Sequence, residues 1–154
     1  MAATVSLDIK SMKKLGLWTR SMTLITRDLS SYFEAAIPGM KERVDQTFQD
    51  EGPGWAPLSP HTIAARQRAG FSAGPILQQT GALRRSATDD AEITVSKRGM
   101  TYRTTLPYAQ IHQEGKGLIP RRSFLNEDQL APVVVDDFGS AFKRRILSTF
   151  RANF

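Results

Sequence analysis

"MTLITRDLSSYFEAAIPGMKERVDQTF", residues 22–48, carries the helical pattern on which the fold depends. Its apolar side chains recur three or four residues apart, the repeat that places them on one face of an α-helix. They are Met22, Ile25, Leu29, Phe33, Met40, Val44 and Phe48. Pro38 and Gly39 interrupt the pattern, because proline lacks a backbone donor and disfavours helix at the residue before it. The segment therefore predicts either two helices divided at Pro38 or one helix kinked there.

The two ends of the chain give further expectations. Residues 1 to about 20 combine weak periodicity with several lysines, which predicts an N-terminal arm that only a neighbour would order. Apolar residues between Val134 and Phe150 return to helical spacing, which predicts a long C-terminal helix. Since 154 residues is an ordinary length for one domain, residues 21–154 are predicted to form a single domain.

A stiff loop follows the first helical segment. Residues 52–70, "GPGWAPLSPHTIAARQRAG", place Trp55 between two prolines. Prolines have little conformational freedom to lose, so they fix the direction of the indole at small entropic cost. Ser59 followed by Pro60 is a favourable helix start, and a short basic helix is predicted up to Gly70. Trp55 then either covers one end of the protein's own core or reaches a neighbouring molecule.

The centre of the chain changes to strand-like alternation. "EITVSK" and "MTYRTTL" each alternate apolar and polar residues, and Arg98-Gly99 separates them, which predicts a β-hairpin. Just before it, Thr80 is a candidate N-cap for a short helix with Leu83 on its buried side. The predicted fold class is therefore α+β, with long N- and C-terminal helices packed around a small, mostly antiparallel sheet with extended loops.

The composition narrows the function classes. The net charge is +6, which suits nucleic acid, an acidic membrane surface or an acidic protein partner without choosing among them. There are no cysteines, which removes disulfides, thiolate zinc sites and cysteine nucleophiles. No apolar run approaches the roughly 20 residues of a membrane span, so we expect no membrane partner and synthesis in the cytoplasm.

Catalytic signals are weak throughout the chain. The histidines are His61 and His112, without metal-ligand spacing, and Ser86 and Ser123 lie in no nucleophile motif. "GKGLIP" lacks the spacing and ending of a phosphate-binding loop. His112 with Glu114 could be a general base with an orienting acid, although such alternate neighbours more often form a solvated edge. The prediction is a protein that is not an enzyme, with no cofactor, metal or small-molecule substrate.

Nucleic acid is the sharper alternative. The two short basic helices predicted at residues 60–70 and 80–86 could pass for a helix-turn-helix, although the loop between them is too irregular. A small basic DNA-binding or regulatory module is therefore the alternative function. Basic residues near the C-terminus usually complement the dipole of their own helix, and they are also the candidates to lie near DNA. These residues are Lys143, Arg144 and Arg145.

Four motifs in a fixed order carry a resemblance that covers about residues 22–150. They are Trp-x-Pro-Leu-Ser, Leu-x-x-Thr-Gly-x-Leu, Tyr-Ala-x-x-His-x-x-Gly and Pro-Arg-x-x-Phe-Leu. In this chain they fall on Trp55, Pro57, Leu58 and Ser59; Leu77, Thr80, Gly81 and Leu83; Tyr108, Ala109, His112 and Gly115; and Pro120, Arg121, Phe124 and Leu125. The pattern resembles the phage virion morphogenesis, or tail completion, proteins of Mu-like and P2-like phages. Arg66 and Arg122, beside these motifs, complete the candidate interface residues.

The resemblance implies a structural virion protein at the head-tail junction or the tail end. It implies a ring of this chain, six copies by analogy with the tail, around the DNA channel. The implied partners are further copies, neighbouring neck, connector or tail proteins, and DNA passing through without sequence preference. Ring contacts run head to tail and need two different complementary patches on each subunit. Either the basic pair Arg121-Arg122 or the basic C-terminal helix is expected to meet an acidic patch on the next subunit, such as Asp50-Glu51 or Asp89-Asp90.

Overall fold

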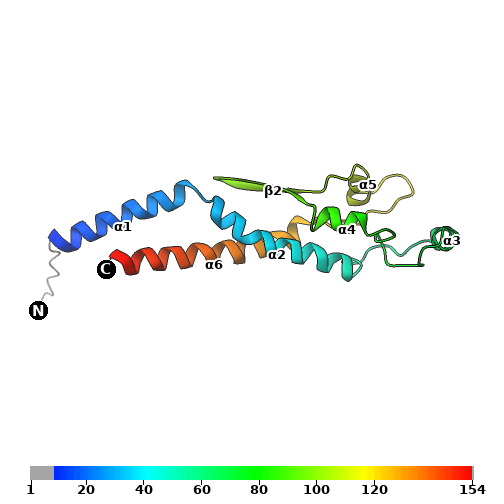
Figure 1. The fold of residues 1–154 in the computed structure, drawn as a ribbon, viewed down its shortest axis with the longest axis horizontal. Coiled ribbons are helices and arrows are strands. Elements are labelled where there is room, and N and C mark those ends of the chain that lie inside the picture. Colours follow the sequence, from blue (N-terminus) through cyan, green and yellow to red (C-terminus); the bar gives the residue numbers. More distant parts are fainter. Residues whose placement is uncertain (1–8, 154) are drawn as a thin grey trace, which may run out of the picture.

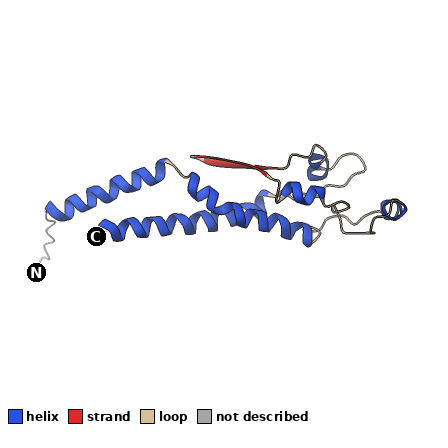
Figure 2. Ribbon diagram, in the orientation of Figure 1, coloured by secondary structure: helices blue, strands red, loops and turns tan. Residues whose placement is uncertain are grey.

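Two long helices, α2 and α6, run alongside each other and support the remaining elements (Figure 1). The computed structural model describes residues 9–153. Its elements are α1 (Ile9–Arg27), α2 (Ser30–Gln49), α3 (Pro60–Arg68), α4 (Ala82–Ala87), β1 (Glu92–Ser96), β2 (Gly99–Arg103), α5 (Ala109–Glu114) and α6 (Glu127–Asn153). Helices flank one small antiparallel sheet, so the predicted α+β class is confirmed (Figure 2).

The break in the first helical region lies at Asp28 and Leu29, and α2 continues through Pro38. Of the two predicted alternatives, the division at Pro38 is therefore wrong and a single helix through Pro38 is found. The Asp28 carboxylate accepts hydrogen bonds from the backbone N–H of Ser30 at 3.0 Å and from its hydroxyl at 2.6 Å. A short polar side chain that captures a nearby backbone donor in this way competes with helix continuation. Leu29 also donates its N–H to the carbonyl oxygen of Lys97 in the hairpin turn, which ties the break to the sheet.

Helix α2 accommodates Pro38 because of where that residue faces. Pro38 and Glu34, whose carbonyl loses its helical donor, are both exposed, so water can satisfy the freed carbonyl. The next residue faces α6: a Cβ on Gly39 would lie 2.2 Å from the Asp137 carboxylate and 3.0 Å from Val133. The Pro-Gly pair therefore marks a close helix crossing.

Helix α1 covers residues for which the sequence predicts an irregular arm. The structure is helical from Ile9, and α1 packs against α6. A packing partner can stabilise a helix whose own periodicity is weak. Residues 1–8 of the predicted arm lie outside the described residues, and the division into an arm and a domain stays a prediction.

The hairpin forms as predicted, but its turn lies one residue earlier than the predicted Arg98-Gly99, because Gly99 already pairs with Ser96 in the ladder. Strands β1 and β2 pair antiparallel from Glu92 with Arg103 to Ser96 with Gly99, so Lys97 and Arg98 form a two-residue turn. The phenolic O–H of Tyr102 donates to the carbonyl of Ala87 at 2.8 Å, which fixes the hairpin to α4. The C-terminal helix also forms as predicted, although it begins earlier than the apolar repeat, at Glu127.

The core lies where α2, α4, α5 and the stretch before α6 meet. Its fully buried members are Val44, Phe48, Leu83, Ala87, Ala109 and Phe124. A second apolar contact joins α2 to α6 through aromatic rings, with Tyr32 lying 5.5 Å from Phe138 and 5.3 Å from Phe142 between ring centroids. Ring pairs at these spacings add stabilisation beyond the area they bury.

Candidate binding cavity

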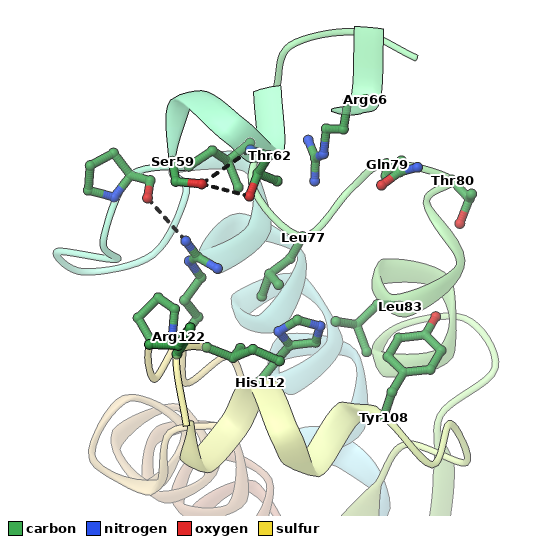
Figure 3. A pocket seen from close by; sticks show the side chains of 15 residues that line it. Ser59, Thr62, Arg66, Leu77, Gln79, Thr80, Leu83, Tyr108, His112 and Arg122 are labelled. Atoms are coloured by element: carbon green, nitrogen blue, oxygen red, sulfur yellow. Dashed lines mark hydrogen bonds between the residues drawn. The ribbon is translucent and has the colours of Figure 1, made fainter. Parts of the chain in front are cut away.

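The four sequence motifs, spread over the chain, come together around one cavity of about 730 Å³ (Figure 3). The loop before α3, the start of α4, helix α5 and the stretch after α5 each contribute to its wall. The predicted residues that line it are Pro57, Leu58, Arg66, Thr80, Leu83, Tyr108, His112 and Arg122. Predicted residues that do not line it are Trp55, Gly81, Gly115, Arg121 and Phe124.

Helix α3 starts at the edge of the cavity with the predicted cap. The hydroxyl of Ser59 accepts a hydrogen bond from the backbone N–H of Thr62 at 3.2 Å, and Pro60 occupies the first turn. Since this cap fixes the direction of the short helix, it also directs Arg66, about two turns further on, toward the cavity (Figure 3). The guanidinium Nη1 of Arg66 donates to the carbonyl of Pro75 at 2.9 Å.

The cap predicted for α4 is wrong in its position. Gly81, at a positive φ of 71°, is the N-cap, and the hydroxyl of its neighbour Thr80 accepts a weak hydrogen bond from the N–H of Ala82 at 3.3 Å. Glycine adopts this left-handed geometry without steric cost, so the chain can turn sharply into the helix. Leu83 is buried as predicted.

Arg122 joins two loops across the cavity wall. Its Nε and Nη2 atoms donate to the carbonyl of Ala56 at 3.0 and 2.8 Å, and Nη2 donates to that of Pro57 at 3.2 Å. Its backbone N–H donates to the carbonyl of His112 at 2.7 Å. Arg122 is only 7% exposed, so the predicted basic surface pair is split: Arg121 faces solvent and Arg122 does not.

The loop after α5 folds back on itself and exposes apolar side chains. Gly115 ends α5 at φ 79° and ψ 150°, and a Cβ there would lie 2.9 Å from the backbone nitrogen of Arg121. The backbones of Lys116 and Ile119 hydrogen bond to each other in both directions at 3.0 Å. Leu118, at the tip, is fully exposed at the edge of the cavity.

Trp55 faces the protein's own core, not the cavity. Its indole Nε1 donates to the carbonyl of Ser123 at 3.0 Å, and its ring meets Phe48 edge to face with centroids 5.9 Å apart. Phe124, which is 1% exposed, packs against the same Phe48 at 5.4 Å. Both aromatic residues therefore pack on the core through Phe48.

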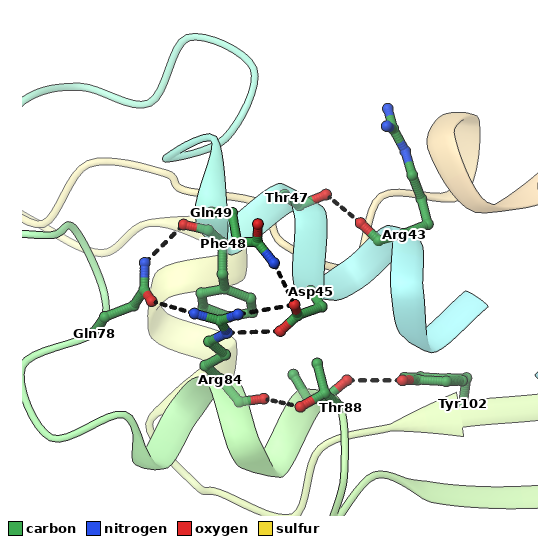
Figure 4. Close-up of polar contacts among 10 residues, drawn as sticks. Arg43, Asp45, Thr47, Phe48, Gln49, Gln78, Arg84, Thr88 and Tyr102 are labelled. Atoms are coloured by element: carbon green, nitrogen blue, oxygen red, sulfur yellow. Dashed lines mark hydrogen bonds and ion pairs between the residues drawn. The ribbon is translucent and has the colours of Figure 1, made fainter. Parts of the chain in front are cut away.

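A polar network next to the core uses residues that sequence reasoning missed (Figure 4). Arg84 binds the Asp45 carboxylate through Nε at 2.6 Å and Nη2 at 2.8 Å, and this lowers the pKa of Asp45. Gln78 accepts from Arg84 and donates to the carbonyl of Phe48 at 2.7 Å. A paired guanidinium and a satisfied amide hold the loop before α4 against the end of α2.

Gln113 is a second residue that the sequence analysis missed. Its Oε1 accepts from the backbone N–H groups of Phe124 and Leu125, both at 3.1 Å. Its Nε2 donates to the Ser123 hydroxyl at 2.8 Å and to the carbonyl of Leu125 at 2.5 Å. The side-chain amide of Gln113 therefore forms hydrogen bonds to backbone groups that a neighbouring β-strand could otherwise satisfy. These bonds position Phe124 in the core. The only indication in the sequence of a role for Gln113 is its position next to His112, inside the third motif.

His112 is held in its neutral form by its surroundings. Burial lowers the pKa of the imidazole, and the positive charge of Arg122 lowers it further. The ring lies 6.2 Å from that of Tyr108, nearly perpendicular to it, and its Nδ1 atom is buried without a hydrogen-bond partner.

The lowered pKa of His112 predicts a loss of stability in acid. The folded state binds the proton less readily than the unfolded chain, whose histidine pKa is about 6.5. This contribution is therefore present above pH 6.5 and is lost as the pH falls through the folded pKa. We expect the free energy of unfolding to fall less between pH 7.5 and 5 in a His112→Gln variant than in the parent chain. An NMR titration that placed the His112 pKa at or above 6.5 would contradict this.

The described residues contain no cluster of three or more His, Cys, Asp or Glu side chains that could hold a metal ion. Across the same part of the chain, no helix is both long enough and apolar enough to span a membrane. Lys143, Arg144 and Arg145 are exposed on α6, away from the cavity.

The chain is thus a small α+β protein in which four separate motifs meet around one cavity. Residues 12–135 match the phage virion morphogenesis family, and the chain belongs to that family. No curated protein and no solved structure matches it. Membership of this family supports a structural role in the phage virion and an association with other virion proteins.

Proposed function

We propose that the chain completes the neck or the tail end of the virion, where head and tail join, as a ring of six copies around the DNA channel. Family membership supports a virion protein. The observation that carries the finer proposal is the presence of two unlike exposed apolar surfaces at opposite ends of an elongated chain (Figure 1).

The first surface lies on the paired helices α1 and α6. Leu17 and Leu24 on α1, and Leu147 and Phe150 on α6, are all large apolar side chains with at least 45% of their area exposed. The second surface lies at the mouth of the cavity, around Tyr108, Leu118 and Ile119. A ring needs two different surfaces on each subunit, because each copy meets its neighbours head to tail. Exposed apolar patches of this kind are typical of interaction sites.

We propose that DNA in the channel contacts basic side chains without recognition of its base sequence. The exposed Lys143, Arg144 and Arg145 on α6 are the proposed DNA-facing residues, and contacts of this kind weaken as salt rises. The alternative of a sequence-specific DNA-binding module is less well supported. Its two candidate helices direct Arg66 and Arg84 into the protein, where they bind Pro75 and Asp45.

Deletion of this chain from the phage tests the proposal. We expect DNA-filled heads and complete-length tails to accumulate separately, and a supplied copy of the parent chain to restore joining. As a matched control, a chain with Lys143, Arg144 and Arg145 replaced by glutamine should still join heads to tails if these residues act only on passing DNA. Normal yields of joined virions after deletion would contradict the proposed role.

A further inference from the structure

We propose that the cavity binds a carboxylate-bearing, otherwise apolar peptide segment of a partner protein. The inference starts from two guanidiniums in its wall, Arg66 and Arg122, each only 7% exposed. Neither forms an ion pair within the described residues, where the ion pairs are Arg84 with Asp45 and Arg103 with Glu92.

Two buried like charges without an anion are an unusual arrangement. Buried charges in proteins are normally paired, because removal from water is costly unless an opposite charge compensates. The hydrogen bonds that these guanidiniums make all go to neutral carbonyls, of Ala56, Pro57 and Pro75. None of the described residues that line the cavity is Asp or Glu. The missing partner is therefore an anion from another molecule.

Two unused polar atoms mark where that anion binds. The Nε–H of Arg66 is buried without an acceptor, and Nδ1 of His112 is buried without a partner. Figure 3 shows both side chains pointing into the same space from opposite walls, Arg66 from α3 and His112 from α5. A carboxylate between them accepts one hydrogen bond from the Nε–H of Arg66 and one from the Nδ1–H of the neutral His112 imidazole. The positive charge of Arg122 adds electrostatic attraction.

The rest of the wall favours a peptide over a nucleic acid. Leu58, Leu77, Leu83, Leu118 and Ile119 line the cavity together with prolines. DNA phosphates are bound chiefly by exposed cations on a surface, whereas here the two guanidiniums are buried in a wall that also carries many apolar side chains. A volume of about 730 Å³ suits a few residues of extended chain with one acidic side chain among apolar ones.

This inference rests on the proposed function only in expecting the segment to come from another virion protein. Leu118, fully exposed at the edge, then packs on the apolar part of the segment while the carboxylate goes deeper. The interior of the cavity is thereby assigned to a partner segment, while the exposed Tyr108 and Ile119 at its mouth and the α1 and α6 surface keep their proposed roles in contacts between copies.

The test is an NMR titration of the ¹⁵N-labelled full chain with a defined peptide pair. The probe is acetyl-Leu-Glu-Leu-amide, and the matched probe, acetyl-Leu-Gln-Leu-amide, differs only in its charge. We expect the acidic peptide at millimolar concentration to shift the Arg66 Nε–H signal saturably. The neutral peptide should bind about tenfold more weakly, because it loses the charge-assisted hydrogen bond.

Three variants make the titration specific. Arg66→Gln should abolish the preference for the acidic peptide, while Arg121→Gln, which removes an exposed charge outside the cavity, should preserve it. Leu118→Glu should weaken binding of the acidic peptide by like-charge repulsion. Because the Leu118 side chain is fully exposed, this third variant tests the site even if Arg66→Gln fails to fold.

Several results would overturn the proposal. One is the absence of a saturable shift of the Arg66 Nε–H signal, and another is equal affinity for the two peptides. A third is displacement of the peptide by a short oligonucleotide, which would favour nucleic acid as the ligand. Loss of self-association in Arg66→Gln would assign the cavity to a second copy instead. Because the titration needs no phage particle, its failure is distinguishable from a failure of the assembly experiment.

Discussion

Replacing Gly52 with alanine is expected to lower the free energy of unfolding by about 2–5 kcal/mol. Gly52 has a φ of 69°, a conformation that strains an L-residue, and its Cβ would lie 2.2 Å from the Trp55 indole. The indole would have to move, losing its hydrogen bond to Ser123 and its contact with Phe48. Urea unfolding followed by circular dichroism measures the loss.

Gly54 is the matched control for this variant. It lies in the same loop at a φ of 72°, but a Cβ there would meet nothing within 4 Å. Gly54→Ala therefore carries the backbone strain alone, about 1–2 kcal/mol. If the two variants lost equal stability, Trp55 would not be packed against the Gly52 backbone as described.

Replacing Phe124 with alanine is expected to cost about 3–5 kcal/mol, because the ring is fully buried and leaves a void in the core. The void would open between Phe48 and the segment at residues 123–125 that Gln113 holds in place. This segment includes Ser123, whose carbonyl accepts the Trp55 hydrogen bond. We therefore expect the cavity wall to become less ordered as well as the core. Urea unfolding gives the magnitude.

Phe71→Ala is the control of the same residue type. Phe71 is 38% exposed and lies outside the core cluster, so its removal should cost about 1 kcal/mol or less. Comparable losses for Phe124 and Phe71 would contradict the position assigned to the core.

Local signals in the sequence predicted the local structure well. Ser59 caps α3 and a hairpin forms, because each feature depends on a few adjacent residues with fixed conformational preferences, although the hairpin turns at Lys97 and Arg98, one residue before the predicted position. The same holds for Leu83 on the buried side of α4. These elements require no knowledge of distant parts of the chain.

Features that depend on tertiary contacts were not predictable. The helix break at Asp28 uses a side-chain hydrogen bond to Ser30 and a backbone hydrogen bond to Lys97 in a hairpin far along the sequence. Pro38 is a strong local signal for a break, but its solvent-facing position in α2 removes most of its cost.

The cavity shows the same division. The four motifs contain most of the residues that line the cavity. The sequence could not show, however, that Arg66 and Arg122 would both be buried while Arg121 stayed exposed. Burial of an arginine depends on carbonyl acceptors that only the folded loops provide, here those of Ala56 and Pro57. The interface roles of the motif residues stay predictions.

Native mass spectrometry of the purified chain, alone and mixed with phage tails that lack it, tests the central claim most directly. The proposed role predicts a discrete ring, or uptake by tails in a copy number that is a multiple of the tail's symmetry. A monomer or dimer that leaves the tails unbound would contradict it.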